Sequence, residues 1–182
     1  MNDMTFIDRD PLGDQQVTLV TMLTDEDRTL ADRVVLCDTP ARLIDGHPWA
    51  TMLLRRIGES VVVRDYVATF AHSEEGARRV LMLTLRLARM AGYEGVAAAS
   101  TLGVAAWCAL SLGRWEMADH LAVQSDLAKA NGLAEIIRKR VATQWFAELL
   151  GDEAEFCVED VRHCCVKTLR QLTEPRACLK RP

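Results

Sequence analysis

The feature that most constrains the fold is a nearly uninterrupted apolar stretch, residues 96–112, which is rich in alanine. Alanine and leucine lose little conformational freedom in a helix, so we predict a helix over residues 94–112. A helix that is apolar almost all round has to be covered on more than one side. The sequence therefore predicts a central, buried helix with other helices packed around it.

The composition agrees with a helical chain. Hydrophobic residues make up 49% of the sequence but aromatic residues only 5%, with 10 glycines and 5 prolines. This composition excludes a disordered chain and an aromatic-rich β-sandwich. We predict a fold that is all-α or nearly so, in which antiparallel helical hairpins stack in a bundle.

Turn residues divide the second half of the chain into helices of similar length. Apolar positions repeat at the helical period, Ser73 has the place of an N-cap, and Gly92 and Gly113 separate segments. The predicted helices span residues 73–92, 94–112, 115–130, 133–150 and 155–172. Because the turns are short, neighbouring helices must run antiparallel.

Shorter secondary-structure elements are predicted in the N-terminal part of the chain. Thr24 followed by Asp27 is typical of an N-cap with an acidic first turn, so a helix is expected to about residue 36. The alternating β-branched residues within 15–23 are typical of one short N-terminal strand.

Two further helices are expected before residue 73. The first covers residues 49–57, with Met52, Leu53 and Ile57 facing inward. The second covers residues 59–71, where a helical spacing of apolar residues competes with a run of valines that favours a strand.

Composition and charge divide the chain into parts. The predicted parts are an acidic leader, an N-terminal helical subdomain, a helical-hairpin core and a basic tail, spanning residues 1–14, 15–72, 73–173 and 174–182. Residues 1–32 contain eight acids and two bases, whereas residues 162–182 contain one acid and six bases. Ends of opposite charge attract each other within one chain or between two chains.

We expect a cytoplasmic protein that binds no membrane. The central stretch falls short of the roughly 20 strongly apolar residues of a membrane span, and the first residues lack the basic and apolar segments of a secretory signal. Six cysteines in 182 residues are too few for a disulfide scaffold. The net charge of −4 offers no general basic surface for nucleic acid.

One helical hairpin has a distinctive pattern of small residues. Small residues stand at Ala106, Ala118 and Ser125, with Gly113 at the turn and Trp115 beside it. This segment resembles the hairpin of a tetratricopeptide repeat, which spans about 34 residues. Because only one repeat is recognisable, the resemblance implies a hairpin and not a complete solenoid.

A wider resemblance covers residues 64–141. Arg64-Asp65, the alanine-rich helix with Trp107, residues 112–118 and residues 133–137 are similar to the C-terminal part of an actinobacterial family of unknown function. Longer members of that family carry an α/β half before this part. The residues before position 65 are too few for such a half, so the resemblance implies no chemistry for this chain.

No motif of a common enzyme class is present. The sequence contains no GxSxG, GxxxxGK[ST] or GxGxxG pattern. Asp119 and His120 are neighbours on a predicted helix and therefore point about 100° apart. We predict a non-enzymatic helical module that binds another protein or a second copy of itself, as an adaptor or inhibitor of a larger partner.

Trp115 is the predicted anchor of the partner-binding surface, together with Arg114 and Glu116. A tryptophan flanked by charged residues after a turn is typical of an interface anchor. The alternative is that Trp115 packs against the next hairpin.

A basic patch is the second predicted surface. It consists of Arg138, Lys139, Arg140, Lys180 and Arg181. These residues favour an acidic protein partner over nucleic acid, because no aromatic residue follows Phe156 to stack on bases.

The alternative function is a structural zinc site or a redox sensor. Cys157, His163, Cys164 and Cys165 are of the types that bind zinc. Their spacing contains no CxxC or HxxxH pair, and Cys157 and Cys164 also fit an ordinary inward-facing stripe of a helix. No cofactor is therefore expected, with zinc as the alternative.

Overall fold

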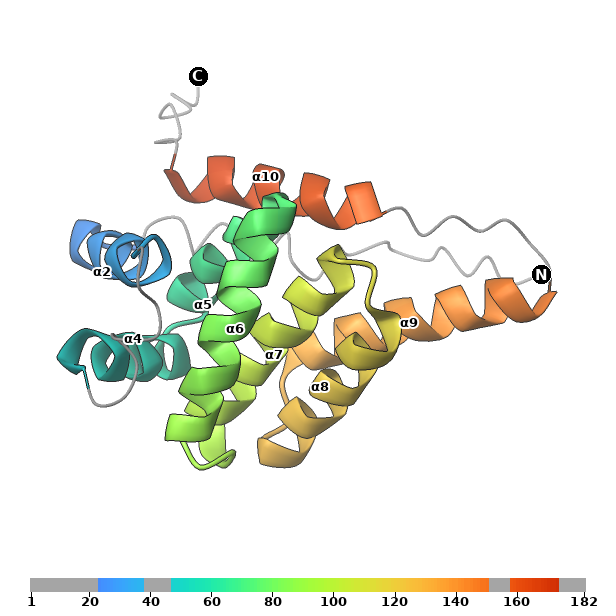
Figure 1. Cartoon of the computed structure of the whole chain (residues 1–182), viewed down its shortest axis with the longest axis horizontal. Helices are drawn as coiled ribbons and strands as arrows, with labels where there is room; N and C mark the ends of the chain where they lie inside the picture. Colours follow the sequence, from blue (N-terminus) through green and yellow to red (C-terminus); the bar gives the residue numbers. More distant parts are fainter. Residues whose placement is uncertain (1–22, 38–46, 151–157, 174–182) are drawn as a thin grey trace, which may run out of the picture.

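The computed structural model describes residues 23–37, 47–150 and 158–173, and within these ranges it is helical and contains no strand (Figure 1). The predicted all-α fold is confirmed. The predicted leader, the basic tail and nearly all of the predicted strand lie outside the described residues.

The helices occur where the sequence pattern predicts them, with ends that differ by a few residues. They are α2 (Asp25–Val35), α4 (Pro48–Glu59), α5 (Val61–Thr69), η1 (Phe70–His72), α6 (Glu74–Met90), α7 (Gly95–Ser111), α8 (Trp115–Ala128), α9 (Gly132–Leu150) and α10 (Val158–Thr173). α6, α7 and α8 lie side by side as antiparallel neighbours, α2 and α4 lie at one end, and α10 crosses above α5 and α6 (Figure 1).

Side-chain caps define the beginnings of several helices. The Thr24 hydroxyl accepts a hydrogen bond from the backbone N–H of Asp27 at 3.1 Å, and the Ser73 hydroxyl accepts one from Gly76 at 3.2 Å. At α4 the Nδ1 atom of His47 accepts from the backbone N–H of Trp49, and proline occupies the first turn. These caps satisfy N–H groups that lack a partner within the helix.

The centre of the fold is α7, which contacts α4, α5, α6, α8, α9 and α10. Nearly every residue of α7 from Ala98 to Ser111 is buried, as the apolar stretch predicts. Two of its polar side chains bond to its own backbone: Thr101 donates to the Ala97 carbonyl and Ser111 to that of Cys108. Among the helices in the described ranges, none has the length and apolar character that crossing a membrane requires.

Small residues let the helices around α7 approach closely. Gly103 of α7 faces Ser125 and Asn131, so that a Cβ atom on Gly103 would lie 3.5 Å from each of their side chains. The Ser125 hydroxyl donates to the Ala99 carbonyl at 2.7 Å, and the Asn131 amide donates to that hydroxyl. Asn131 also accepts from the backbone N–H of Ala134, which ties the start of α9 to α7 and α8.

The N-terminal helices share the core with the hairpins. One cluster of buried side chains extends from Ala31 in α2 to Leu172 in α10. Gly58 of α4 lies against Ala97 of α7, and the predicted N-terminal part is thus packed directly on the central helix.

An ion pair joins α2 to α4. Both carboxylate oxygens of Asp27 accept hydrogen bonds from the Arg56 guanidinium at 2.7 Å. Asp27 is only 4% exposed, and the hydrogen bonds from Arg56 hold its pKa below the usual value. A second link joins α2 to α5, because the hydroxyl of Tyr66 in α5 donates to Asp32 of α2 at 2.7 Å.

One predicted core position is wrong. Leu53 and Ile57 are buried, but Met52 is 45% exposed. The buried stripe of α4 consists of Ala50, Leu53 and Ile57, and Met52 points about 100° away from its neighbour Leu53. Met52 therefore faces the solvent beside α2.

Replacing Gly58 by alanine should destabilise the protein. A Cβ atom there would lie 2.9 Å from the Cβ and 3.0 Å from the Cα of Ala97, so α4 would have to move away from α7. Overpacking costs about 1–3 kcal/mol, which a gain of roughly 1 kcal/mol in helix propensity offsets only in part. Urea unfolding measures the change. The control Gly132→Ala, with no atom within 4 Å, should lose no stability, and equal losses in the two variants would contradict the close approach.

Replacing Asp27 by asparagine should lower the free energy of unfolding by about 1–3 kcal/mol at pH 7, because a charge-assisted pair is lost. The lowered pKa means that this contribution is present above the usual pKa of 3.8 and disappears as the pH falls through the lowered value. The difference from wild type should therefore shrink below about pH 4 in urea titrations. Glu59→Gln is the control. Glu59 is an exposed partner of Arg56, so its replacement should lower the free energy of unfolding by less than about 0.5 kcal/mol.

Candidate partner-binding groove

A groove of about 450 Å³ lies between α2 and α4. Its lining combines charged, apolar and aromatic side chains, namely Asp25, Glu26, Thr29, Leu30, Arg33, Trp49 and Met52. The first five follow one face of α2, and the last two come from the first turns of α4. The ion pair of Asp27 with Arg56 holds the two helices in this relation.

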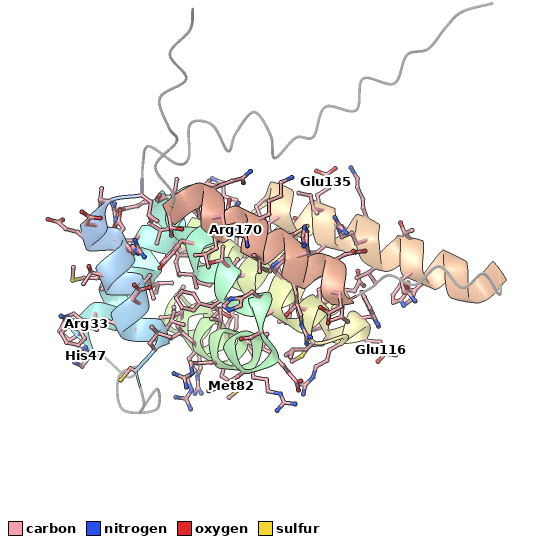
Figure 2. The ribbon with its side chains drawn as sticks, turned by 90° about the horizontal axis from the view of Figure 1, so that it is seen from above. Arg33, His47, Met82, Glu116, Glu135 and Arg170 are labelled. Carbon is pink, nitrogen blue, oxygen red and sulfur yellow. The ribbon has the colours of Figure 1, made fainter. Side chains whose placement is uncertain are left out.

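Trp49 is held in place from two directions. The guanidinium carbon of Arg33 lies 4.4 Å from the centre of the Trp49 ring, and the His47 ring centre lies 5.0 Å away. Arg33 and His47 accordingly lie close together beside α2 (Figure 2). A guanidinium over an indole face is a cation–π contact, so the arginine and the tryptophan stabilise each other's position.

The groove offers apolar surface beside this stack. Leu30 is half-buried against the core, and Met52 is 45% exposed. Tryptophan, arginine and methionine are the residue types that are enriched in protein interfaces. Their combination in one groove is typical of a contact surface for another protein.

The rim of the groove is acidic at the start of α2. Asp25 and Glu26 are exposed, and within the described part of the chain neither forms an ion pair. Their neighbour Asp27, in contrast, is neutralised by Arg56. The rim can therefore attract a positive charge on a partner.

The predicted anchor residues lie at the other end of the molecule. Figure 2 shows Glu116 far from Arg33. Arg114 and Glu116 are exposed, whereas Trp115 is half-buried and packs against the hydrophobic core. Gly113, with a φ of 69°, turns the chain so that this hairpin rests near Val158 of α10.

Two residues of the predicted basic patch form surface ion pairs. Arg138 lies 3.3 Å from Asp126, and Lys139 lies 2.7 Å from Glu135. Arg140 is half-buried and also has an interaction, while Lys180 and Arg181 lie outside the described residues. Arg138 and Lys139 are thus already partnered at the surface, which leaves them less available to an acidic partner.

The predicted zinc ligands are not brought together where they are described. His163 is exposed, Cys164 is half-buried, Cys165 is buried, and Cys157 lies outside the described residues. Within the described ranges, no three His, Cys, Asp or Glu side chains are arranged to hold a metal.

Cys165 instead joins three helices in the core. Its sulfur accepts a hydrogen bond from the Trp107 Nε1–H at 3.2 Å, and its thiol donates to the Ala68 carbonyl at 3.7 Å. Burial raises the pKa of Cys165 to about 11 and also raises the pKa of the nearby Cys108 thiol. Both thiols are thus held in their neutral form, which is neither a nucleophile nor a metal ligand.

Sequence reasoning missed the groove between α2 and α4. Met52 is a large apolar residue beside the buried stripe of Ala50, Leu53 and Ile57, but this signal becomes usable only once the structure selects that stripe. Off-stripe apolar residues near a tryptophan are candidates for a contact surface.

Comparisons of the chain with protein-family models, curated proteins and solved structures found no significant match. The resemblances to a tetratricopeptide hairpin and to an actinobacterial family therefore stay predictions.

Iodoacetamide at pH 8 should modify Cys37 and Cys164 in the native protein and leave Cys108 and Cys165 unmodified. The first two thiols are half-buried and the last two are buried. A pKa of about 11 in place of 9.0 lowers the thiolate fraction about 100-fold. Mass spectrometry of peptides measures the labelling, and denatured protein, in which these thiols should react alike, is the control. Rapid labelling of native Cys165 would contradict its place in the core.

Proposed function

We propose that the protein is a non-enzymatic helical module that binds another protein in the groove between α2 and α4, as an adaptor or inhibitor of that partner. The observation that carries the proposal is the Arg33–Trp49 stack beside the exposed Met52. A preordered arginine and tryptophan lose little side-chain freedom on binding, which favours affinity.

The groove indicates the chemistry of the partner. Leu30, Trp49 and Met52 provide a surface for a large apolar side chain. Asp25 and Glu26 provide a place for lysine or arginine at the rim. The proposed occupant is therefore a segment of another protein in which a large apolar residue stands close to a basic residue.

Charge supports this choice over an acidic partner. Arg138 and Lys139 are engaged by Asp126 and Glu135, whereas Asp25 and Glu26 form no ion pair within the described ranges. The acidic start of α2 is thus the more available charged surface for a complementary partner.

Peptides selected for binding from a randomised displayed library test this proposal. Two exposed methionines provide a matched pair of variants for the test. We expect enriched peptides to combine a large apolar residue with lysine or arginine. Met52→Asp should weaken their binding about tenfold or more, measured by fluorescence anisotropy. Met82→Asp, at a methionine of α6 that is 55% exposed and outside the groove lining, should leave the affinity within about twofold.

Other results identify other surfaces. If Arg114→Ala weakens binding and Met52→Asp does not, the partner binds at the α7–α8 turn and the groove assignment is wrong. A dimer in analytical ultracentrifugation that Met52→Asp dissociates would make a second copy of the chain the occupant. Acidic consensus peptides would contradict the proposed partner chemistry.

A further inference from the structure

A second cavity lies on another face of α2. It has a volume of about 300 Å³ and is bounded by α2, by α5 with η1, and by the last turns of α10. It is lined by Arg28, Asp32, Leu36, Tyr66, Thr69, Phe70, His72, Leu169 and Thr173. In Figure 1 the C-terminal end of α10 lies above α2, and α10 contributes Leu169 and Thr173 to the lining of the cavity.

The cavity holds two opposite charges that do not pair with each other. Arg28 and Asp32 are four residues apart on α2, a spacing at which such side chains commonly form an ion pair. Within the described ranges, however, neither side chain forms one. Asp32 Oδ1 instead accepts the hydroxyl of Tyr66, which leaves Oδ2 for another donor.

Tyr66 fixes the position of the carboxylate. The tyrosine is only 3% exposed, and burial together with its hydrogen bond to Asp32 raises the pKa of its hydroxyl to about 12, against a smaller opposing effect of the nearby Arg28 guanidinium. The hydroxyl therefore stays protonated and remains a donor to Asp32 at neutral pH. Its ring is held by an edge contact with Phe70 at 5.7 Å between centres.

The remaining wall combines apolar and polar side chains. Phe70 and Leu169 are half-buried, and Leu36 is 54% exposed at the end of α2. Thr69, His72 and Thr173 complete the lining. A ligand in this cavity thus meets one carboxylate, one guanidinium, the imidazole of His72 and a hydrophobic surface.

We propose that this cavity binds a free apolar α-amino acid. Its ammonium group donates to Asp32, its carboxylate accepts from Arg28, and its side chain contacts Leu36, Phe70 and Leu169. The proposal is independent of the partner groove, which uses other residues of α2.

The charges argue for a zwitterion over a simple ion. A simple anion would bring a negative charge close to Asp32, and a simple cation would bring a positive charge close to Arg28. Like charges placed together cost binding free energy, whereas a zwitterion satisfies both groups. A volume of about 300 Å³ is at the small end of ligand pockets and suits a ligand of this size.

Isothermal titration calorimetry with L-leucine and L-phenylalanine tests the proposal, with phenylethylamine and 3-phenylpropionate as analogues that lack one charge. We expect both amino acids to bind and each analogue to bind at least about tenfold more weakly. No heat from either amino acid at concentrations up to about 10 mM would overturn the proposal. Equal binding of phenylethylamine or 3-phenylpropionate would also overturn it.

Variants locate the ligand. Arg28→Gln and Asp32→Asn should each lower the affinity about tenfold or more, while Arg55→Gln and Glu75→Gln, exposed on α4 and α6, should leave it unchanged. Circular dichroism checks that the variants fold. Because Asp32 also bonds to Tyr66, the exposed Arg28 keeps the test decisive if Asp32→Asn unfolds. Unchanged affinity in Arg28→Gln would place the ligand elsewhere.

Discussion

The close packing of small residues along α7 is the constraint on which the rest of the structure depends. Gly103 lets Ser125 and Asn131 approach from α8 and the start of α9, and Ala97 lies directly against Gly58 of α4. Backbones that approach this closely gain many weak contacts without large side chains, which accounts for a stable core with few aromatic residues. Trp107 is the exception, and it reaches Cys165 of α10.

The position of α2 follows from that packing and creates both candidate binding surfaces. Once α4 is seated on α7, the ion pair between Asp27 and Arg56 fixes α2 beside it. The acidic residues of α2 then differ in what they do. Asp27 is neutralised within the fold, Asp32 is bound by Tyr66, and Asp25 and Glu26 remain at the surface. One short helix thus borders both the proposed partner groove and the proposed amino-acid cavity.

Local patterns predicted the helices well, whereas the contacts made at the surfaces depend on neighbouring helices. The caps at Thr24 and Ser73 depend on atoms three residues apart, so the sequence contains their whole cause. Met52 was misplaced because two stripes on α4 fit the helical period, and only the neighbouring helices select one. Arg138 of the predicted patch pairs with Asp126, which is twelve residues away on another helix. No pattern within one helix contains such a contact.

The sequence by itself determined that the protein is helical, where most helices begin and end, and that α7 is central, because propensity, capping and periodicity act over a few residues. The tertiary structure alone decided that Arg33 lies on Trp49, that Asp32 and Arg28 face one cavity, and that Cys165 is a core residue. The reason is physical: each of these relations depends on a neighbouring helix, and the angle and distance between helices are set by packing in three dimensions.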